Sequence, residues 1–317
     1  MRFHHFDDVQ DHLDGLGLFN MDFGLDRMRK ALAALGLDHP PFVTAQIVGT
    51  NGKGSTSTFL ACLARAHGVK TGLYTSPHFV TPRERIRIDG RMLPESAWPA
   101  LAERVMQAAP ALTYFEFLTV LGLLAFAEAG VDFVVLEAGL GGHYDATSAA
   151  PVQAVCFTPI GMDHEKILGP TLTDIATDKA QAMRPGVPAS AAPQEEEALA
   201  CLRRTAQEKG AELHETADLP FPDGKNAAAF HAESIGRVAA GNQDLEAPNL
   251  VQDIILAALV QLAHDVVQED HRRFPGDPPV KPGFPQPQCH SAAPLLPSGA
   301  EGPGGQAADG QREVVPV

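Results

Sequence analysis

The stretch Ile47-Val48-Gly49-Thr50-Asn51-Gly52-Lys53-Gly54-Ser55 decides the fold, because it leads from an apolar strand through a glycine-rich turn into a helical pattern. Glycines let backbone N–H groups close around phosphates, the start of a helix adds partial positive charge, and Lys53 can reach the terminal phosphates. The spacing differs from the standard P-loop, since Gly54 follows the lysine where Ser or Thr is usual. We predict that residues 49–55, the glycine loop, bind phosphate. The alternative is a strand–helix turn without a ligand.

Apolar runs and helical patterns alternate on either side of this loop. Strands are predicted over residues 45–48, 70–75, 132–136 and 152–158, each almost continuously apolar or β-branched, as expected of strands buried on both faces. Helices are predicted over residues 55–67, 114–129, 171–184 and 195–210, and the first two end at a glycine suited to a left-handed cap. The alternation predicts an α/β fold with a mostly parallel sheet flanked by helices.

The last third of the sequence has a different character. One apolar helix is predicted over residues 250–267, and residues 274–317 contain 10 Pro and 7 Gly, a density typical of low-complexity chains. We therefore expect one nucleotide-binding domain over residues 1–217, a partial or degenerate segment with one helix over 218–273, and a disordered tail over 274–317.

Composition excludes several classes of protein. With 24 Lys+Arg against 39 Asp+Glu the net charge is −15, which argues against a broad nucleic-acid or anionic-membrane surface. No apolar run approaches the ~20 residues of a membrane helix, and the N-terminus lacks an apolar signal core. The four cysteines are far apart in the sequence, which is typical of a reduced, cytoplasmic protein.

Polar residues follow the other predicted strands. Ser76, Glu137 and His164 each come at or shortly after the end of one, and the carboxyl ends of parallel strands share one edge of the sheet. Because Mg²⁺ prefers carboxylate and hydroxyl oxygens, Glu137 is a candidate ligand, and the hydroxyl would come from Ser55 or Ser76. The alternatives are a turn-forming serine, a solvated acid and a structural histidine.

Lys179 interrupts the apolar stripe of the helix predicted over residues 171–184 and should point inward. The simple interpretation is a lysine that snorkels, with its ammonium in water. The alternative is that the amine has a chemical role, as a charge or after modification.

Five segments together resemble the folylpolyglutamate synthase/dihydrofolate synthase family, relatives of the Mur ligases. They are GTNGKGST (49–56), YTSPHFVTPRERIRIDG (74–90), TYFEFLT (113–119), VLEAGLGGHYDATS (135–148) and MDHEKILGPTLTDIATDKA (162–180), and MDFGLDRM (21–28) is a weaker match. The resemblance spans about residues 20–215. It implies a Mur-ligase-like P-loop ATPase domain and an ATP-dependent ligase that joins L-glutamate to dihydropteroate or folates through an acyl phosphate.

The resemblance also implies roles for individual residues. ATP phosphates would be held by Thr50, Asn51, Gly52, Lys53, Gly54 and Ser55, and Mg²⁺ by Ser76, Glu137 and His164. The catalytic residues would be Lys53, His164 and Lys179, the last matching a lysine that is carbamylated in the family. The pterin site would be lined by Asp22, Gly24, Leu25, Thr113, Tyr114, Phe115, Glu116, His143, Tyr144 and Asp145.

Departures from the family pattern set limits on these expectations. His143 stands where Arg is usual and Ser148 where Asn is usual, and Asp178-Lys-Ala-Gln181-Ala replaces the usual Glu-Lys-Ala-Gly-Ile. After residue 218 the motifs of the family's second domain are not readable. A catalytically impaired nucleotide-binding remnant is therefore the alternative function, and a Mur-type peptidoglycan enzyme or a regulatory P-loop NTPase fits the motifs less well. We expect a monomer that binds Mg-ATP with slow or uncoupled phosphate release and has only small-molecule partners.

Overall fold

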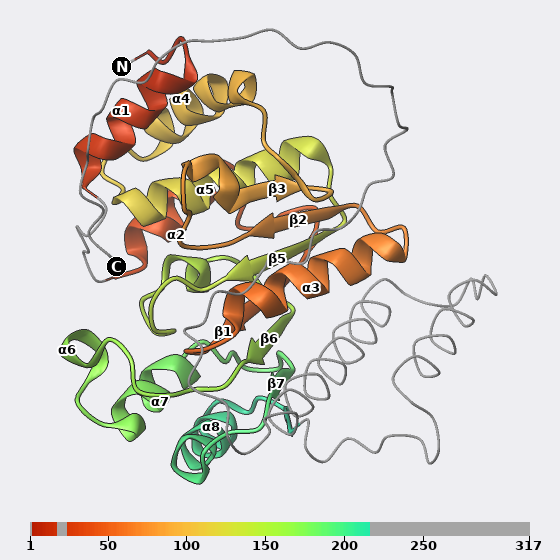
Figure 1. Ribbon diagram of the computed structural model, residues 1–317, viewed down its shortest axis with the longest axis vertical. Coiled ribbons are helices and arrows are strands. Elements are labelled where there is room, and N and C mark those ends of the chain that lie inside the picture. Colours follow the sequence, from red (N-terminus) through yellow and green to blue (C-terminus); the bar gives the residue numbers. More distant parts are fainter. Residues whose placement is uncertain (1, 18–23, 216–317) are drawn as a thin grey trace, which may run out of the picture. The chain divides into compact units, whose positions relative to one another are not determined.

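The computed structural model describes residues 2–17 and 24–215. They form one eight-stranded sheet in the order β4-β3-β2-β5-β1-β6-β7-β8 (Figure 1). The central strands are β1 (Val43–Val48), β2 (Thr71–Tyr74), β5 (Phe133–Glu137) and β6 (Ala154–Phe157), all parallel to their neighbours among these four. Each overlaps a strand predicted from the sequence.

Shorter strands extend both sides of the sheet. β7 (Ala189–Ala191) and β8 (Leu213–Glu215) continue the parallel order, whereas β3 (Ile86–Ile88) and β4 (Arg91–Met92) are antiparallel. The expected mostly parallel α/β sheet is confirmed, with an antiparallel hairpin added at one edge.

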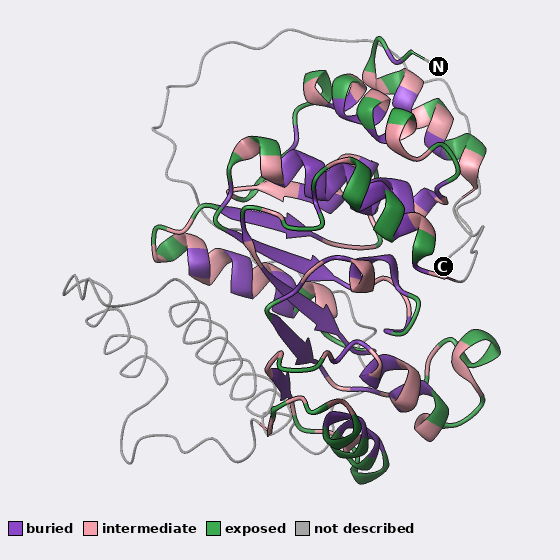
Figure 2. Cartoon of the chain, turned by 180° about the vertical axis from the view of Figure 1, so that it is seen from behind, coloured by how far each residue is buried: buried purple, intermediate pink, exposed green. Residues whose placement is uncertain are grey.

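Helices bury both faces of the central strands. On one face of the sheet, Ile47 of β1 and Val135 of β5 pack with Leu60 of α3 (Lys53–Ala66). On the opposite face, Val134 packs with α5 (Tyr114–Ala129), and Phe157 of β6 packs with α7 (Leu172–Ala180). Figure 2 shows the central strands in the colour of buried residues. Burial of both faces explains why these strands are mostly apolar on both sides, with Thr44 and Gln46 of β1 as buried polar exceptions.

Further helices complete the layers. α1 (Phe6–Leu16), α2 (Asp26–Ala34) and α4 (Trp98–Ala108) join the core on the α5 side, and α8 (Glu196–Lys209) packs against α7. Short helical turns are η1 (Pro82–Arg85), η2 (Glu95–Ala97), η3 (Ala146–Ala149) and α6 (Glu165–Leu168). Among the described helices, none combines the length and apolar character needed to cross a membrane.

One predicted helix is too long at its C-terminal end. α7 stops at Ala180 rather than Arg184. The residue before a proline avoids the helical region, and Pro185 follows Arg184 directly, so the chain leaves the helix early. The helix expected over 250–267 and the tail over 274–317 lie outside the described residues.

Candidate nucleotide and metal site

The glycine loop is shaped by two glycines and fixed by the turn that follows β6. Gly49 has φ 152, and a Cβ atom there would lie 1.9 Å from Oγ1 of Thr158, so only glycine fits. The N–H groups of Thr50 and Asn51 donate to the Pro159 carbonyl at 3.0 and 3.1 Å. The Thr50 hydroxyl donates to the Gly161 carbonyl at 3.0 Å. These contacts join the ends of β1 and β6.

Helix α3 begins immediately after the loop. Gly52, with φ 81, is its N-cap, and Lys53 is its first residue. The first N–H groups of a helix have no partner within it and carry partial positive charge, so those of Lys53, Gly54 and Ser55 suit a phosphate. The Lys53 ammonium lies beside the loop and donates to the Thr50 carbonyl at 3.2 Å. The predicted order of strand, glycine loop and helix is present.

Glu137 ends β5 as a buried carboxylate, 3% exposed. Its Oε2 accepts a hydrogen bond from the Ser76 backbone N–H at 2.9 Å, and a Cβ on Gly54 would lie 3.3 Å from its Oε1. Burial raises the pKa of Glu137 to about 7, against the opposing effects of the Ser76 hydrogen bond and the Lys53 charge. The ends of β1, β2 and β5 therefore bring Lys53, Ser76 and Glu137 into one place.

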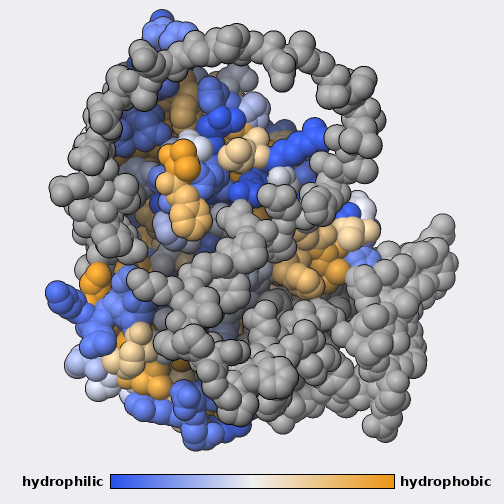
Figure 3. Space-filling model, viewed as in Figure 1, coloured by the Kyte–Doolittle hydropathy of each residue, from blue (hydrophilic) through white to orange (hydrophobic). Residues whose placement is uncertain are grey.

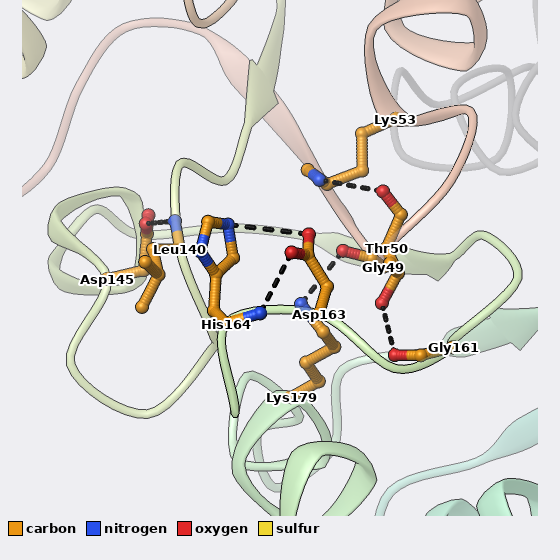
Figure 4. A network of polar contacts seen from close by, with 9 residues as sticks. All are labelled: Gly49, Thr50, Lys53, Leu140, Asp145, Gly161, Asp163, His164 and Lys179. Atoms are coloured by element: carbon orange, nitrogen blue, oxygen red, sulfur yellow. Dashed lines mark hydrogen bonds and ion pairs between the residues drawn. The ribbon is translucent and has the colours of Figure 1, made fainter. Parts of the chain in front are cut away.

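His164 occupies the loop after β6 in a left-handed conformation, with φ 51. Its Nε2 lies 3.4 Å from Oδ2 of Asp163, and its backbone N–H donates to Oδ1 of Asp163 at 2.8 Å (Figure 4). Both side chains are nearly half exposed. The figure places this pair beside Lys179, Thr50 and Gly161.

The donors present fit Mg²⁺ better than a metal held by protein side chains alone. In the described parts of the chain, no cluster of three or more His, Cys, Asp or Glu side chains could hold an ion. Mg²⁺ is commonly held by one or two carboxylates together with phosphate oxygens and water. Glu137, with Ser76 beside it, would supply such a partial set, and bound nucleotide the rest.

Lys179 lies inside the protein, 2% exposed, and its ammonium donates to the Gly49 carbonyl at 2.9 Å. The interpretation of a snorkelling lysine is therefore wrong. Burial, and then the nearby Lys53 charge, lower the pKa of Lys179 to about 8. Lys53 and Lys179 thus approach consecutive carbonyls of the glycine loop from two helices (Figure 4).

The loop after β5 is organised by Asp145, which the resemblance assigns to the pterin site. Its carboxylate is buried and accepts hydrogen bonds from the Gly139, Leu140 and Thr147 N–H groups and the Thr147 hydroxyl. The next residues toward the N-terminus, His143 and Tyr144, are exposed, with ring centroids 4.0 Å apart. Asp145 therefore holds the loop, while its neighbours face outward.

The segment from Thr113 to Glu116 starts α5 as a capping box, in which each end residue bonds the backbone of the other. Glu116 is also paired with Arg27 at 3.0 Å. Tyr114 is buried, and Phe115 packs against Gly139, where a Cβ would lie 2.6 Å from its ring. Gly24 and Leu25 lead into α2, whereas Asp22 lies outside the described residues.

The structure adds residues that the sequence interpretation missed. Arg27 is one, and its partner Glu116 lies 89 positions away in the sequence. Arg85 is another: it is buried, donates to Nδ1 of His78 at 2.8 Å and lies over the Tyr114 ring. The capping box at Thr113 was readable from its Thr-x-x-Glu pattern. The two arginine contacts had no local signal.

Apolar side chains are exposed around the same edge of the sheet. Phe79 and Val80 follow β2, Tyr144 follows β5, and Met162 and Ile167 follow β6. Figure 3 shows hydrophobic and hydrophilic patches side by side on the face seen in Figure 1. The loops that carry the glycine-loop site therefore also expose surface that a substrate or another polypeptide segment can cover.

The fold and the glycine loop together define a P-loop-type α/β domain of the Mur-ligase-like class, with a candidate phosphate-binding loop. No family model matches the chain. Curated proteins do match it. The chain is 40% identical over 205 residues to dihydrofolate synthase/folylpolyglutamate synthase of Escherichia coli, and the alignment covers 64% of this chain and 48% of that protein. It is 43% identical over 171 residues to folylpolyglutamate synthase of Arabidopsis thaliana, covering 51% and 30%.

Solved structures show a similarity to the same enzymes. Escherichia coli FolC in complex with DHPP and ADP has a TM-score of 0.64 and 33% identity, covering 80% of this chain and 66% of that one. The Yersinia pestis bifunctional folylpolyglutamate synthase/dihydrofolate synthase with AMPPNP and Mn ion has a TM-score of 0.63 and 28% identity. Over the matched part, the chain is a relative of the folylpolyglutamate synthase/dihydrofolate synthase family. It spans half or less of the length of the curated relatives cited.

Proposed function

We propose that the protein is part or all of an ATP-dependent ligase that joins L-glutamate to dihydropteroate or folates. The observation that carries the proposal is the meeting of Lys53, Glu137 and Lys179 at the glycine loop. Its nucleotide side is supported by Escherichia coli FolC, solved with ADP, and by the Yersinia pestis enzyme, solved with AMPPNP and Mn ion. ATP and Mg²⁺ are the proposed cofactors.

The chain's own groups suit phosphoryl transfer to a carboxylate. The α3 N-terminus and the Lys53 ammonium would neutralise phosphate charge, and positioning with electrostatics provides most of the catalysis in such reactions. Bound Mg²⁺, held by Glu137, Ser76 and His164, would neutralise the transferring phosphoryl group. The substrate carboxylate would attack the γ-phosphorus of ATP, and ADP would leave, which gives an acyl phosphate. The glutamate amine would then attack the acyl carbon and lose a proton, and inorganic phosphate would leave as the amide forms.

Lys179 would act in the carbamylated form. A pKa of about 8 leaves a fraction of the amine neutral near neutral pH, and carbamylation by CO₂ requires a neutral amine. The product would be an anion near Lys53, which replaces the repulsion between two ammonium groups by attraction. The acyl substrate would lie along Gly24, Leu25, the start of α5 and the loop with His143 and Tyr144.

The proposal extends to the setting of the protein. We propose a cytoplasmic monomer, with residues 1–217 as the ATP-binding domain and no nucleic-acid or membrane partner. The acidic composition supports the absence of a nucleic-acid surface.

The test is a phosphate-release assay with ATP, Mg²⁺, dihydropteroate or folate, and L-glutamate, with the products analysed by mass spectrometry. We expect phosphate release that requires Mg²⁺ and the pterin substrate, and that Glu137→Gln abolishes. Release that is indifferent to the pterin substrate, without a glutamylated product, would contradict the proposal.

A further inference from the structure

Gly142 is held from both sides by side chains from different parts of the chain. Its N–H donates to Oδ2 of Asp178 at 2.9 Å, and its carbonyl accepts from the Ser148 hydroxyl at 2.7 Å. Asp178 belongs to α7, whereas Ser148 belongs to η3, which follows the same loop. Two of the family departures noted in the sequence, Ser148 and Asp178, thus contact one residue, and another, His143, follows it directly.

The packing at this point requires glycine. A Cβ on Gly142 would lie 2.4 Å from the Lys179 carbonyl and 2.9 Å from the Lys179 Cα. A Cβ on Gly141, which has φ 71, would lie 2.3 Å from Oδ2 of Asp178. The loop backbone therefore rests directly on the turn of α7 that carries Lys179.

Ser148 extends these contacts to the strand before the glycine loop. Its hydroxyl accepts from Nε2 of Gln46 at 2.9 Å, and Gln46 is a fully buried residue of β1. The backbone carbonyl of Ser148 accepts a hydrogen bond from the Arg184 guanidinium, beyond the end of α7, at 2.7 Å. A continuous set of hydrogen bonds therefore connects β1, which leads into the glycine loop, with the loop that follows Glu137 and with α7, which carries Lys179.

We propose that Asp178 and Ser148 are positioning residues that form a two-sided clamp on Gly142. The clamp fixes the loop over residues 139–145 on α7, and so sets the position of Lys179 relative to Glu137 and the glycine loop. Its link to nucleotide affinity rests on the proposed function, whereas its existence does not.

The test uses Asp178→Ala, Ser148→Ala, their double variant and the conservative Asp178→Asn, with hydrogen exchange of the Gly142 amide and calorimetric Mg-ATP affinity as readouts. Asp178→Ala should speed exchange about tenfold, the effect of one charge-assisted hydrogen bond. Each single variant should weaken Mg-ATP binding about fivefold or more, and the double variant no more than the stronger single one, because the loop is already released. Asp178→Asn keeps an acceptor oxygen and should stay within about twofold of wild type.

Asp174→Ala is the matched control. Asp174 lies on the same helix and completes its capping box with Thr171, so its loss should lower thermal stability without changing either readout. Unchanged Gly142 exchange in Asp178→Ala, fully additive single effects, or equal effects of Asp174→Ala would each overturn the clamp. If the wild-type chain binds no Mg-ATP, the proposed function fails. Hydrogen exchange of the Gly142 amide still tests whether Asp178 and Ser148 hold the loop.

Discussion

Replacing Lys179 with Met should stabilise the protein at neutral pH. Burial and the neighbouring Lys53 lower the pKa of Lys179 from 10.5 to about 8. At about 1.36 kcal/mol per pKa unit, the ammonium is about 3 kcal/mol less favourable in the folded protein than in water. Met keeps most of the packing but loses the hydrogen bond to Gly49, worth about 1 kcal/mol. We therefore expect the free energy of unfolding to rise by about 1–2 kcal/mol at pH 7.

The sign of the pH dependence follows from the lowered pKa. Between the folded pKa of about 8 and the ordinary value of 10.5, the unfolded chain binds more protons, so the stability of wild type rises with pH. The advantage of Lys179→Met should therefore be full below pH 8 and shrink above it. Adding bicarbonate should also reduce it, if wild type becomes carbamylated.

The assay is urea unfolding followed by circular dichroism, in CO₂-free buffers from pH 6.5 to 9.5. Lys166→Met, an exposed lysine of α6, is the matched control and should change stability by less than about 0.5 kcal/mol. A loss of 1 kcal/mol or more in Lys179→Met at pH 7 would refute the reasoning that the buried ammonium is unfavourable.

The remaining predictions concern two candidate Mg²⁺ ligands, Glu137 and His164, and the start of α5. Mg-ATP affinity should rise from pH 6 to 8 in wild type, because Mg²⁺ binds the carboxylate and the pKa of Glu137 is about 7, so that binding below that pH releases a proton. The rise should be absent in Glu137→Gln by calorimetry, and an unchanged slope would count against this ligand. His164→Ala should abolish Mg²⁺-dependent phosphate release with an unchanged circular dichroism spectrum, and full release at limiting Mg²⁺ would exclude His164. Thr113→Ala removes a helix cap and should lower the free energy of unfolding by about 1 kcal/mol in urea titrations, whereas no change would show that the cap is dispensable.

The central sheet could be predicted because its strands are buried on both faces. β5 and β6 are largely apolar, whereas β1 also buries the polar Thr44 and Gln46. α5 matches its predicted bounds because Thr113 and Gly130 cap it. β7 was not predicted, since Ala189-Ser190-Ala191 has no strong strand preference and pairs only through its tertiary neighbours. The β3–β4 hairpin was missed for a similar reason, because its strands have three and two residues.

The sequence predicted where site residues lie better than it predicted which residues they contact. The helical stripe predicted an inward Lys179, and the strand ends predicted that Ser76 and Glu137 would meet. The hydrogen bond from Lys179 to Gly49 spans 130 positions, and the pair of Arg27 and Glu116 spans 89. Such contacts depend on how helices dock on the sheet, which periodicity does not encode. Asp145 shows the same limit: the resemblance implied a place for it in the pterin site, whereas its hydrogen bonds to its own loop could not be predicted from the sequence.

The most direct test of the nucleotide site is calorimetric titration of Mg-ATP into the wild-type chain, Lys53→Ala and the control Lys70→Ala. Lys70 donates to the Ala129 carbonyl, at the start of β2 and away from the carboxyl edge of the sheet. We predict one bound nucleotide for wild type and Lys70→Ala, and at least about tenfold weaker binding for Lys53→Ala, since a charge-assisted contact to phosphate is lost. Equal affinity for Lys53→Ala and wild type would contradict a phosphate-binding glycine loop.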